Sequence, residues 1–429
     1  MSSSRLRIAL KDHRRESVAL ANALHAAGHE FVPLGAEADV LLIDLDPPVL
    51  LHKDLIDRYA DMGAKIVLYP HGAGGPILSY EGLFDPDPRV DANLVSALGQ
   101  AEFFRRTGYP AEVHVIGSTH CAPRPFRACA DVKRVLFAPT HPNGDGSLIA
   151  SRRERNAEVF AELLKGPWEL TVRHLGTLEQ NGLWKVDGVR FVNAMGVAQT
   201  TQIDAADVVV AGDGTFPTLA ITRGTPTVMY DQHVLAWGLP DEEGVKPRRP
   251  ELYHDYIHFP FDVEDGPLDE VIAAAATNFE PAAQWRRRFV GEPFTPLAAV
   301  NIIERVVLGG PVPVQVDATR SRTTLALTDE LLERPKLLQA YARTANDDAS
   351  LLLWTPGVGA DQALALAEQA IEHAGVDPDA LGDVLLVPLP GSPKADAELA
   401  ARADALLSEW PSAGKIGELP RFAAAAALV

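Results

Sequence analysis

Histidines follow four of the segments that the sequence predicts as β-strands: His13, His71, His141 and His174. In a parallel sheet the carboxyl ends of the strands lie along one edge, and such folds bind their ligands there. An imidazole titrates near neutral pH and can take a proton from a hydroxyl group. These residues at these places therefore predict acid–base chemistry at the edge of a parallel sheet.

The glycine-rich loop 70–76 holds our first choice for a general base. His71 stands at its start, and Gly72 beside it leaves room for an acceptor. The competing choice is His13, which Asp12 could orient. The structural alternatives are a buried packing histidine at position 71 and a solvated, charge-rich loop at positions 12 and 13.

A second feature is a tight turn between an apolar strand, 207–211, and a helix. The turn contains Asp213 and Gly214, Thr215 is a plausible N-cap, and the helix opens at Phe216. Gly214 lets the backbone come close to a ligand, and the free N–H groups of a helix N-terminus attract anions. The pattern predicts a phosphate site here. The alternative is an ordinary connection in an α/β core.

Strands alternate with helices along most of the chain, which predicts parallel sheets with crossover helices. Proline- and glycine-rich segments at 123–125 and 309–313 separate three such patterns. We therefore expect an α/β protein with two tandem Rossmann-like domains, 1–122 and 123–308, and a small accessory α/β domain, 316–429. Helices are predicted at 264–278, 282–307, 329–344, 360–374 and 396–410.

Composition narrows the class of protein. The chain has 429 residues, is 47% hydrophobic and carries a net charge of −19, which argues against non-specific binding of nucleic acid. No apolar run is long enough for a membrane helix, and the N-terminus does not resemble a secretion signal, so we expect a cytoplasmic protein. Two cysteines are too few for a disulfide framework. The histidines are dispersed rather than clustered, and no metal is expected.

Five short segments together resemble the CDP-glycerol glycerophosphotransferase group of the GT-B superfamily of nucleotide-dependent transferases. UDP-GlcNAc 2-epimerases share part of the pattern. The similarity covers about residues 1–308 in order and spacing. The segments are Tyr69–Gly72, Leu136–Thr140, Val172–His174, Ala206–Thr215 and Gly224–Val228.

This resemblance implies that two sheets face each other across a cleft, with an N-terminal acceptor domain and a C-terminal nucleotide-donor domain. Arg173 and His174 would contact the phosphates of the donor. Thr140 would add a hydroxyl group from the facing loop. His141 replaces an arginine of the family pattern, and Asp213-Gly214-Thr215 replaces its hydroxyl pair, so the donor stays open.

The sequence thus predicts a metal-independent transferase that moves a glycosyl or polyol-phosphate group from a nucleotide-activated donor to a hydroxyl acceptor in surface-polymer synthesis. No cofactor is expected besides the donor. The alternatives are an epimerase of the UDP-GlcNAc type and a catalytically silent protein that binds a nucleotide sugar or serves as a scaffold. The basic run Arg286–Arg288 could contact an anionic acceptor, a membrane surface or a protein complex. A homo-oligomer is a further open alternative.

Overall fold

The structure is a computed structural model of the whole chain. The residues that it describes are 5–11, 15–44, 53–69, 88–101, 111–118, 123–139, 146–196, 198–212, 215–230, 259–291, 293–308, 322–345, 348–387, 389, 391–410 and 414–422.

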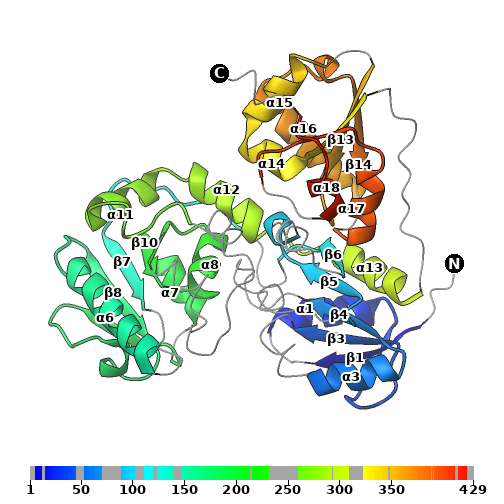
Figure 1. The fold of residues 1–429 in the computed structure, drawn as a ribbon. Helices are drawn as coiled ribbons and strands as arrows, with labels where there is room; N and C mark the ends of the chain where they lie inside the picture. The colour runs from blue at the N-terminus through cyan, green and yellow to red at the C-terminus, as the bar shows by residue number, and fades with distance from the viewer. Residues whose placement is uncertain are drawn as a thin grey trace. The chain divides into compact units, whose positions relative to one another are not determined.

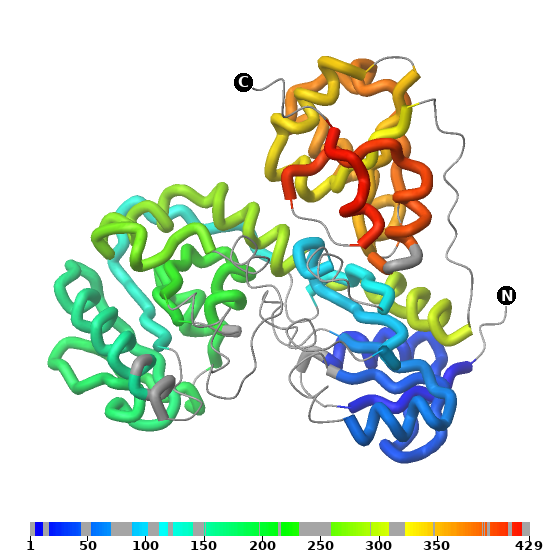
Figure 2. The backbone as a smooth tube through the Cα atoms, in the orientation of Figure 1, coloured from blue at the N-terminus to red at the C-terminus, as the bar shows by residue number. Residues whose placement is uncertain are grey.

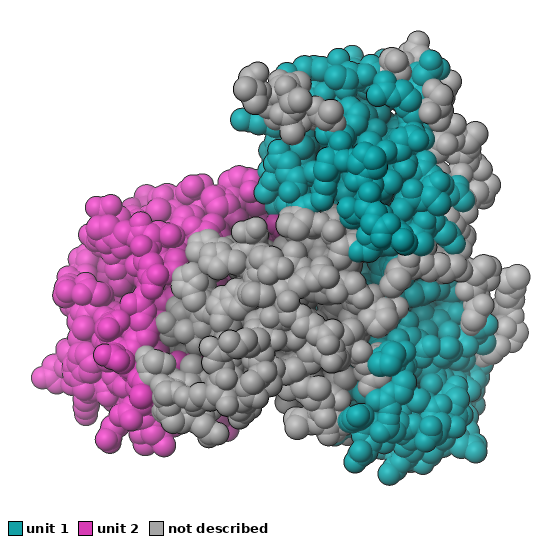
Figure 3. Space-filling model, viewed as in Figure 1, with its two compact units in different colours: residues 1–71, 79–117, 294–429 teal, residues 72–78, 118–293 magenta. Residues whose placement is uncertain are grey.

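Three parallel sheets with helices packed on them make up the described chain, so the predicted α/β class is confirmed (Figure 1). The chain divides into two compact units, coloured separately in Figure 3. The first unit contains residues 1–71, 79–117 and 294–429, and the second contains 72–78 and 118–293. The first and third sheets belong to the first unit, and the second sheet belongs to the second.

The first sheet has the strand order β2-β1-β3-β4-β5-β6. Its central strands are apolar runs buried on both faces, as at residues 40–43 and 66–69, which is typical of parallel sheets between helices. The elements are β1 (Arg7–Lys11), α1 (Arg15–Ala26), β2 (Glu30–Val32), β3 (Val40–Asp44), α3 (Lys53–Asp61), β4 (Lys65–Tyr69), β5 (Ala92–Val95) and β6 (Glu112–Val115).

The predicted helix 282–307 is wrong, because the structure has two helices there, α12 (Glu280–Phe289) and α13 (Pro296–Leu308). Gly291 between them adopts φ +82°, a left-handed conformation that ends a helix. Although α13 follows the second sheet in sequence, it packs on the first sheet (Figure 2). Its buried side chains, Ala299, Val300 and Ile303, join the core cluster formed with α1 and β4. This helix therefore belongs to the first unit, whereas the sequence assigned it to the second domain.

The second sheet has the order β11-β10-β7-β8-β9. One face carries α6 and an aromatic core in which Phe137 and Phe160 stack with ring centroids 6.2 Å apart. The other face is covered by α7 and α8 through Leu136, Ile203 and Leu219. The elements are β7 (Arg134–Ala138), α6 (Gly146–Leu163), β8 (Glu169–His174), β9 (Arg190–Asn193), α7 (Gln199–Ala205), β10 (Val208–Ala211), α8 (Thr215–Thr222), β11 (Thr227–Met229) and α11 (Leu268–Thr277).

The third sheet has the order β14-β13-β12-β15 and includes a strand that the sequence analysis did not predict. Residues 396–410 were predicted as one helix, but only α17 is helical there, and β15 pairs in parallel with β12. The predicted helix 329–344 is likewise broken before Pro335. The elements are β12 (Arg322–Leu327), α14 (Thr328–Glu333), α15 (Pro335–Ala342), β13 (Ala349–Trp354), α16 (Ala360–Ala374), β14 (Asp383–Val387), α17 (Pro393–Ala400), β15 (Ala405–Leu407) and α18 (Gly414–Gly417).

Candidate functional site

The strand order of the second sheet marks its ligand-binding edge. From β7 the chain proceeds outward to β8 and β9, and then returns to the other side of β7 with β10 and β11. Open α/β sheets bind ligands outside the carboxyl ends of the strands at such a reversal. The backbone N–H of Gly212 donates to the carbonyl of Ala138 over 3.2 Å and joins the two strand ends at this point.

Helix α8 begins close to this reversal, four residues after β10 ends at Ala211. Its first residues, Thr215 and Phe216, bring unpaired backbone N–H groups and the positive end of the helix dipole to the edge. The sequence predicted this local structure. Asp213, Gly214, Thr140 and His141 follow the strand ends but lie outside the described residues, so their role in binding a donor stays a prediction.

Arg173 ties the end of β8 to three neighbouring segments. Its guanidinium donates to the carbonyl of Ala194 over 3.0 Å and to Oε1 of Gln202, and its Cζ lies 5.4 Å from the ring centre of Phe216. The side chain is buried, and burial lowers the pKa of Arg173. This geometry fixes the first turn of α8 against β8. Direct contact of Arg173 with donor phosphates stays a prediction.

His174 is the last residue of β8 and is half-buried. Its Nδ1 lies 2.9 Å from the carbonyl oxygen of Gly176. A carbonyl only accepts, so Nδ1 carries the proton and, in the neutral ring, Nε2 is left as an acceptor. The interaction orients the imidazole at the carboxyl edge, two strands from β10.

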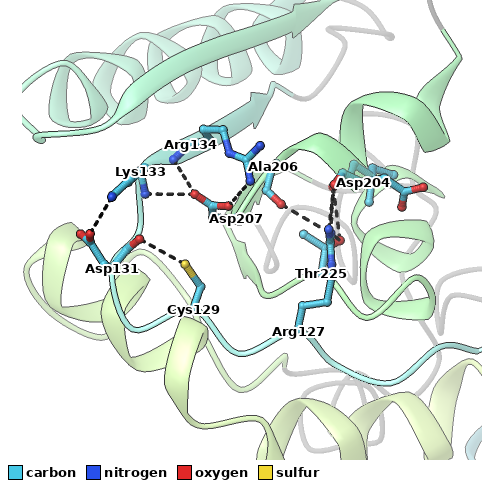
Figure 4. A network of polar contacts seen from close by, with 10 residues as sticks. Arg127, Cys129, Asp131, Lys133, Arg134, Asp204, Ala206, Asp207 and Thr225 are labelled. Atoms are coloured by element: carbon cyan, nitrogen blue, oxygen red, sulfur yellow. Dashed lines mark hydrogen bonds and ion pairs between the residues drawn. The ribbon is translucent and has the colours of Figure 1, made fainter.

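A polar network fixes the opposite ends of β7 and β10 (Figure 4). The carboxylate of Asp207 accepts from the backbone N–H groups of Lys133 and Arg134, at 3.0 and 2.9 Å, and from the guanidinium of Arg134 at 2.6 Å. Burial opposes the charge of Asp207, but these hydrogen bonds outweigh it and lower the pKa of the carboxyl group. Asp207 stands in a segment that resembles the family, and here it joins the amino-terminal ends of β7 and β10.

Arg127 supports the same region from the segment before β7. Its guanidinium donates to the carbonyls of Asp204, Ile203 and Ala206 at the end of α7 and to the hydroxyl of Thr225 (Figure 4). A cation at a helix C-terminus satisfies carbonyl groups that have no partner within the helix. Sequence reasoning did not single out Arg127, and its position in an apparent linker gave no signal.

The first sheet has its own reversal between β1 and β3, since β2 lies on the other side of β1. Asp12 and His13 come directly after β1, so their loop starts at this reversal. The loop with His71 and Gly72 starts at the end of β4, two strand spacings or about 10 Å away. All four residues lie outside the described ranges.

One hydrogen bond connects the starting points of these two loops. The hydroxyl of Tyr69 donates to the carbonyl of Lys11 over 3.1 Å, which fixes the end of β4 relative to the end of β1. The loop with His13 and the loop with His71 therefore start from strand ends that are fixed relative to each other. The choice between His71 and His13 as general base stays a prediction.

The arginine run on α12 makes contacts within its own unit. Arg286 donates to the carbonyls of Arg124 and Ile221, and its Cζ lies 4.5 Å from the ring centre of Phe126. Arg287 bonds Glu280 over 3.3 Å. These contacts give two of the three arginines a structural role.

Two features are absent from the described ranges. No group of three histidine, cysteine or acidic side chains there could hold a metal ion. Among the helices described, none combines the length and the apolar character that a membrane span requires.

Neither a protein-family model nor a curated protein sequence matches the chain. Among solved structures, the spinosyn rhamnosyltransferase SpnG is 14% identical with a TM-score of 0.36, over 70% of this chain and 100% of that one. A C2-type ketoreductase from a modular polyketide synthase is 12% identical with a TM-score of 0.20, over 89% of this chain and 91% of that one. Both scores are too low to support a conclusion on fold or activity, so the α/β class is established by the three sheets themselves.

Proposed function

We propose that this protein is a GT-B transferase that moves a glycosyl or polyol-phosphate group from a nucleotide-activated donor to a hydroxyl acceptor. The observation that supports this most is the reversal of strand order between β7 and β10, with the N-terminus of α8 next to it. A diphosphate needs backbone donors and positive potential, and this position offers both. The family-like segments Ala206–Thr215 and Gly224–Val228 flank helix α8 in the sequence.

In the proposed reaction, the N–H groups at the start of α8 stabilise the negative charge that develops on the leaving nucleotide. Arg173 and Phe216 hold that helix start in position, and His174 offers a polar side chain at the same edge. His71 takes the proton of the acceptor hydroxyl, with His13 and Asp12 as the competing pair. The proposal includes no metal.

Nucleotide binding tests the proposal first. We expect CDP, UDP, GDP or CMP to raise the melting temperature selectively, because a ligand that binds only the folded state stabilises it, by about 2.7 kcal/mol at a hundredfold excess over Kd. No shift with any of the four nucleotides would favour the alternative of a silent scaffold without a nucleotide site. Epimerisation of a bound nucleotide sugar without transfer would favour the epimerase.

Substitution of the general base tests the chemistry. His71→Ala should lower turnover by roughly 10²- to 10⁴-fold while the nucleotide-dependent thermal shift is kept. His25→Ala on the exposed side of α1 is the matched control and should keep full turnover. If His71→Ala stays active and His13→Ala does not, the base assignment moves to the loop after β1.

A further inference from the structure

A groove of about 560 Å³ lies on the face of the second sheet beside α7, in the size range of small-molecule sites. Helix α7 has seven residues and packs over β7 through Ile203 and Ala206. The neighbouring strands β8 and β9 contribute the floor of the groove through Thr171, Arg190 and Val192. None of the residues that line it belongs to the predicted donor or acceptor site.

The strand register shows that the floor residues share one face. Leu136 pairs with Thr171, and Thr171 pairs with Arg190, so the three form a row across β7, β8 and β9. Neighbours in a parallel register point to the same side of a sheet. Leu136 packs against Ile203 of α7, which places the row on the face that α7 covers only in part.

Gln202 of α7 lines this groove and leaves an amide group without an acceptor. Its Oε1 accepts from Arg173, and a guanidinium only donates, so the orientation of the amide is fixed. The residue is 9% exposed, and its Nε2 has no hydrogen-bond partner among the described residues. Buried amide donors without an acceptor are rare in proteins, and each calls for an explanation. The bond from Arg173 holds Gln202 as a fixed polar part of the groove wall.

Arg190 supplies the positive charge of the groove. Its side chain makes no ion pair or hydrogen bond with any residue that the structure describes. Arg134, the other arginine of the lining, is already compensated by Asp207 and lies within electrostatic reach of Glu169. The guanidinium of Arg190 is therefore the cation that a bound anion would meet.

The remaining lining suits a hydroxylated ring. Thr171 and Thr201 offer hydroxyl groups that donate and accept, and Glu169 accepts hydrogen bonds from hydroxyl groups. Val192 and Ala205 add short aliphatic surface, against which the C–H side of a sugar ring can pack. The groove thus combines the cation Arg190, the ion-paired Arg134, the carboxylate of Glu169, neutral polar groups and a small apolar area.

We propose that this groove binds a monosaccharide-sized anion, a sugar ring that carries a carboxylate or a phosphate. The anionic group accepts from Arg190, and ring hydroxyls bond Thr171 and Thr201. The site is separate from the donor site at α8 and does not depend on the proposed transfer reaction.

Calorimetric titration of the full chain with glucuronate and glucose 6-phosphate tests the site, with neutral glucose as the comparison. Both anions should bind, and glucose should bind at least about tenfold more weakly because it lacks the charge-assisted hydrogen bond. Arg190→Glu should weaken both anions by at least about tenfold. Arg343→Glu is the same substitution at an exposed position of the first unit and should leave binding unchanged.

A second variant tests the groove without changing charge. Ala205→Trp places a large ring in the groove from an exposed position and should abolish binding of both anions. If wild type, Arg190→Glu and Ala205→Trp bind the two anions with equal affinity, the proposal is overturned. It is also overturned if inorganic phosphate competes for the groove as strongly as glucose 6-phosphate does. Nucleotide-dependent thermal shifts should be the same in Arg190→Glu and wild type. Failure of the groove proposal would appear in the anion affinities, whereas failure of the transferase proposal would appear in the nucleotide-dependent thermal shifts.

Discussion

At the scale of single residues, Glu112 on β6 has a strongly lowered pKa. Burial alone would raise its pKa, but hydrogen bonds from His114 and Arg305 outweigh burial and lower the pKa of the carboxyl group to about 2. The Nε2 of His114 lies 3.1 Å from Oε2 of Glu112 and 3.0 Å from the guanidinium of Arg305. Arg305 comes from α13, so this group of three side chains attaches α13 to the first sheet.

The lowered pKa predicts acid lability of the first unit. A carboxyl group with a pKa of 4.5 when unfolded and about 2 when folded stabilises the fold above pH 4.5, and this contribution is lost as the pH falls toward 2. Glu112→Gln should remove roughly 1 to 3 kcal/mol of stability at neutral pH and flatten the dependence between these values. Urea unfolding at neutral and acidic pH measures both.

Glu37→Gln is the control for this experiment, because Glu37 is 85% exposed in its ion pair with Arg7. It should leave the unfolding free energy and its pH dependence nearly unchanged. Equal acid sensitivity of wild type and Glu112→Gln would show that the contact between α13 and β6 adds no stability.

At the scale of elements, the end of α8 depends on one glycine. Gly224 has φ +72°, and a Cβ at this position would lie 2.0 Å from the carbonyl oxygen of Pro125. The segment around Pro125 is not a free linker, because Arg124 and Arg127 donate backbone hydrogen bonds to Thr222 and Gly224 over 2.8 and 2.9 Å. The close approach holds α8 at the reversal of the second sheet.

Gly224→Ala should therefore destabilise the second unit more than an ordinary left-handed glycine does. Gly188→Ala is the matched control, since Gly188 has φ +84° in the same unit and nothing lies within 4 Å of its added Cβ. The control should cost about 1 to 2 kcal/mol and Gly224→Ala clearly more, because the carbonyl of Pro125 must move. Urea midpoints at an unchanged m-value give the comparison, and equal losses would contradict the packing argument.

At the scale of the whole molecule, the third sheet is not an independent appendage of the first unit. Loops after β13 and β14 pair with the edge strand β6, where Val115 donates to Gly357 over 2.7 Å and Val113 donates to Gly391 over 3.0 Å. An open edge strand invites pairing with other chains. The accessory domain therefore covers the edge of the first sheet with the ends of its own strands.

Gly357→Ala should loosen this contact, because a Cβ there would lie 2.7 Å from the carbonyl oxygen of Val113. We expect faster hydrogen exchange at the amides of Val113 and Val115, by about tenfold for each 1.4 kcal/mol of lost docking energy. Gly359→Ala, at a position with nothing within 4 Å of the added Cβ, should exchange as wild type does. Unchanged exchange in Gly357→Ala would mean that β6 is protected without the third sheet.

The sequence by itself determined the class of the fold and the location of most strands. Apolar runs and turn residues are local signals, so β4 at residues 65–69, α16 at 360–374 and β14 at 383–387 are confirmed to the residue. The start of α8 after a glycine-containing turn is also local, and it was predicted to within one residue. For the same reason, the sequence could assign His13, His71 and His174 to strand ends but could not say which strands are neighbours.

Only the tertiary structure decided which strand ends meet. The reversals between β1 and β3 and between β7 and β10 depend on pairing over long sequence distances, which leaves no mark in any short window. The return of α13 to the first sheet and the pairing of β15 with β12 have the same origin, because the apolar spacing of a segment does not say which surface it covers. The bonds from Arg173 to Gln202 and Ala194 join residues more than twenty positions apart. They hold Arg173 in place against Phe216, at the helix start that the sequence had marked as an anion site.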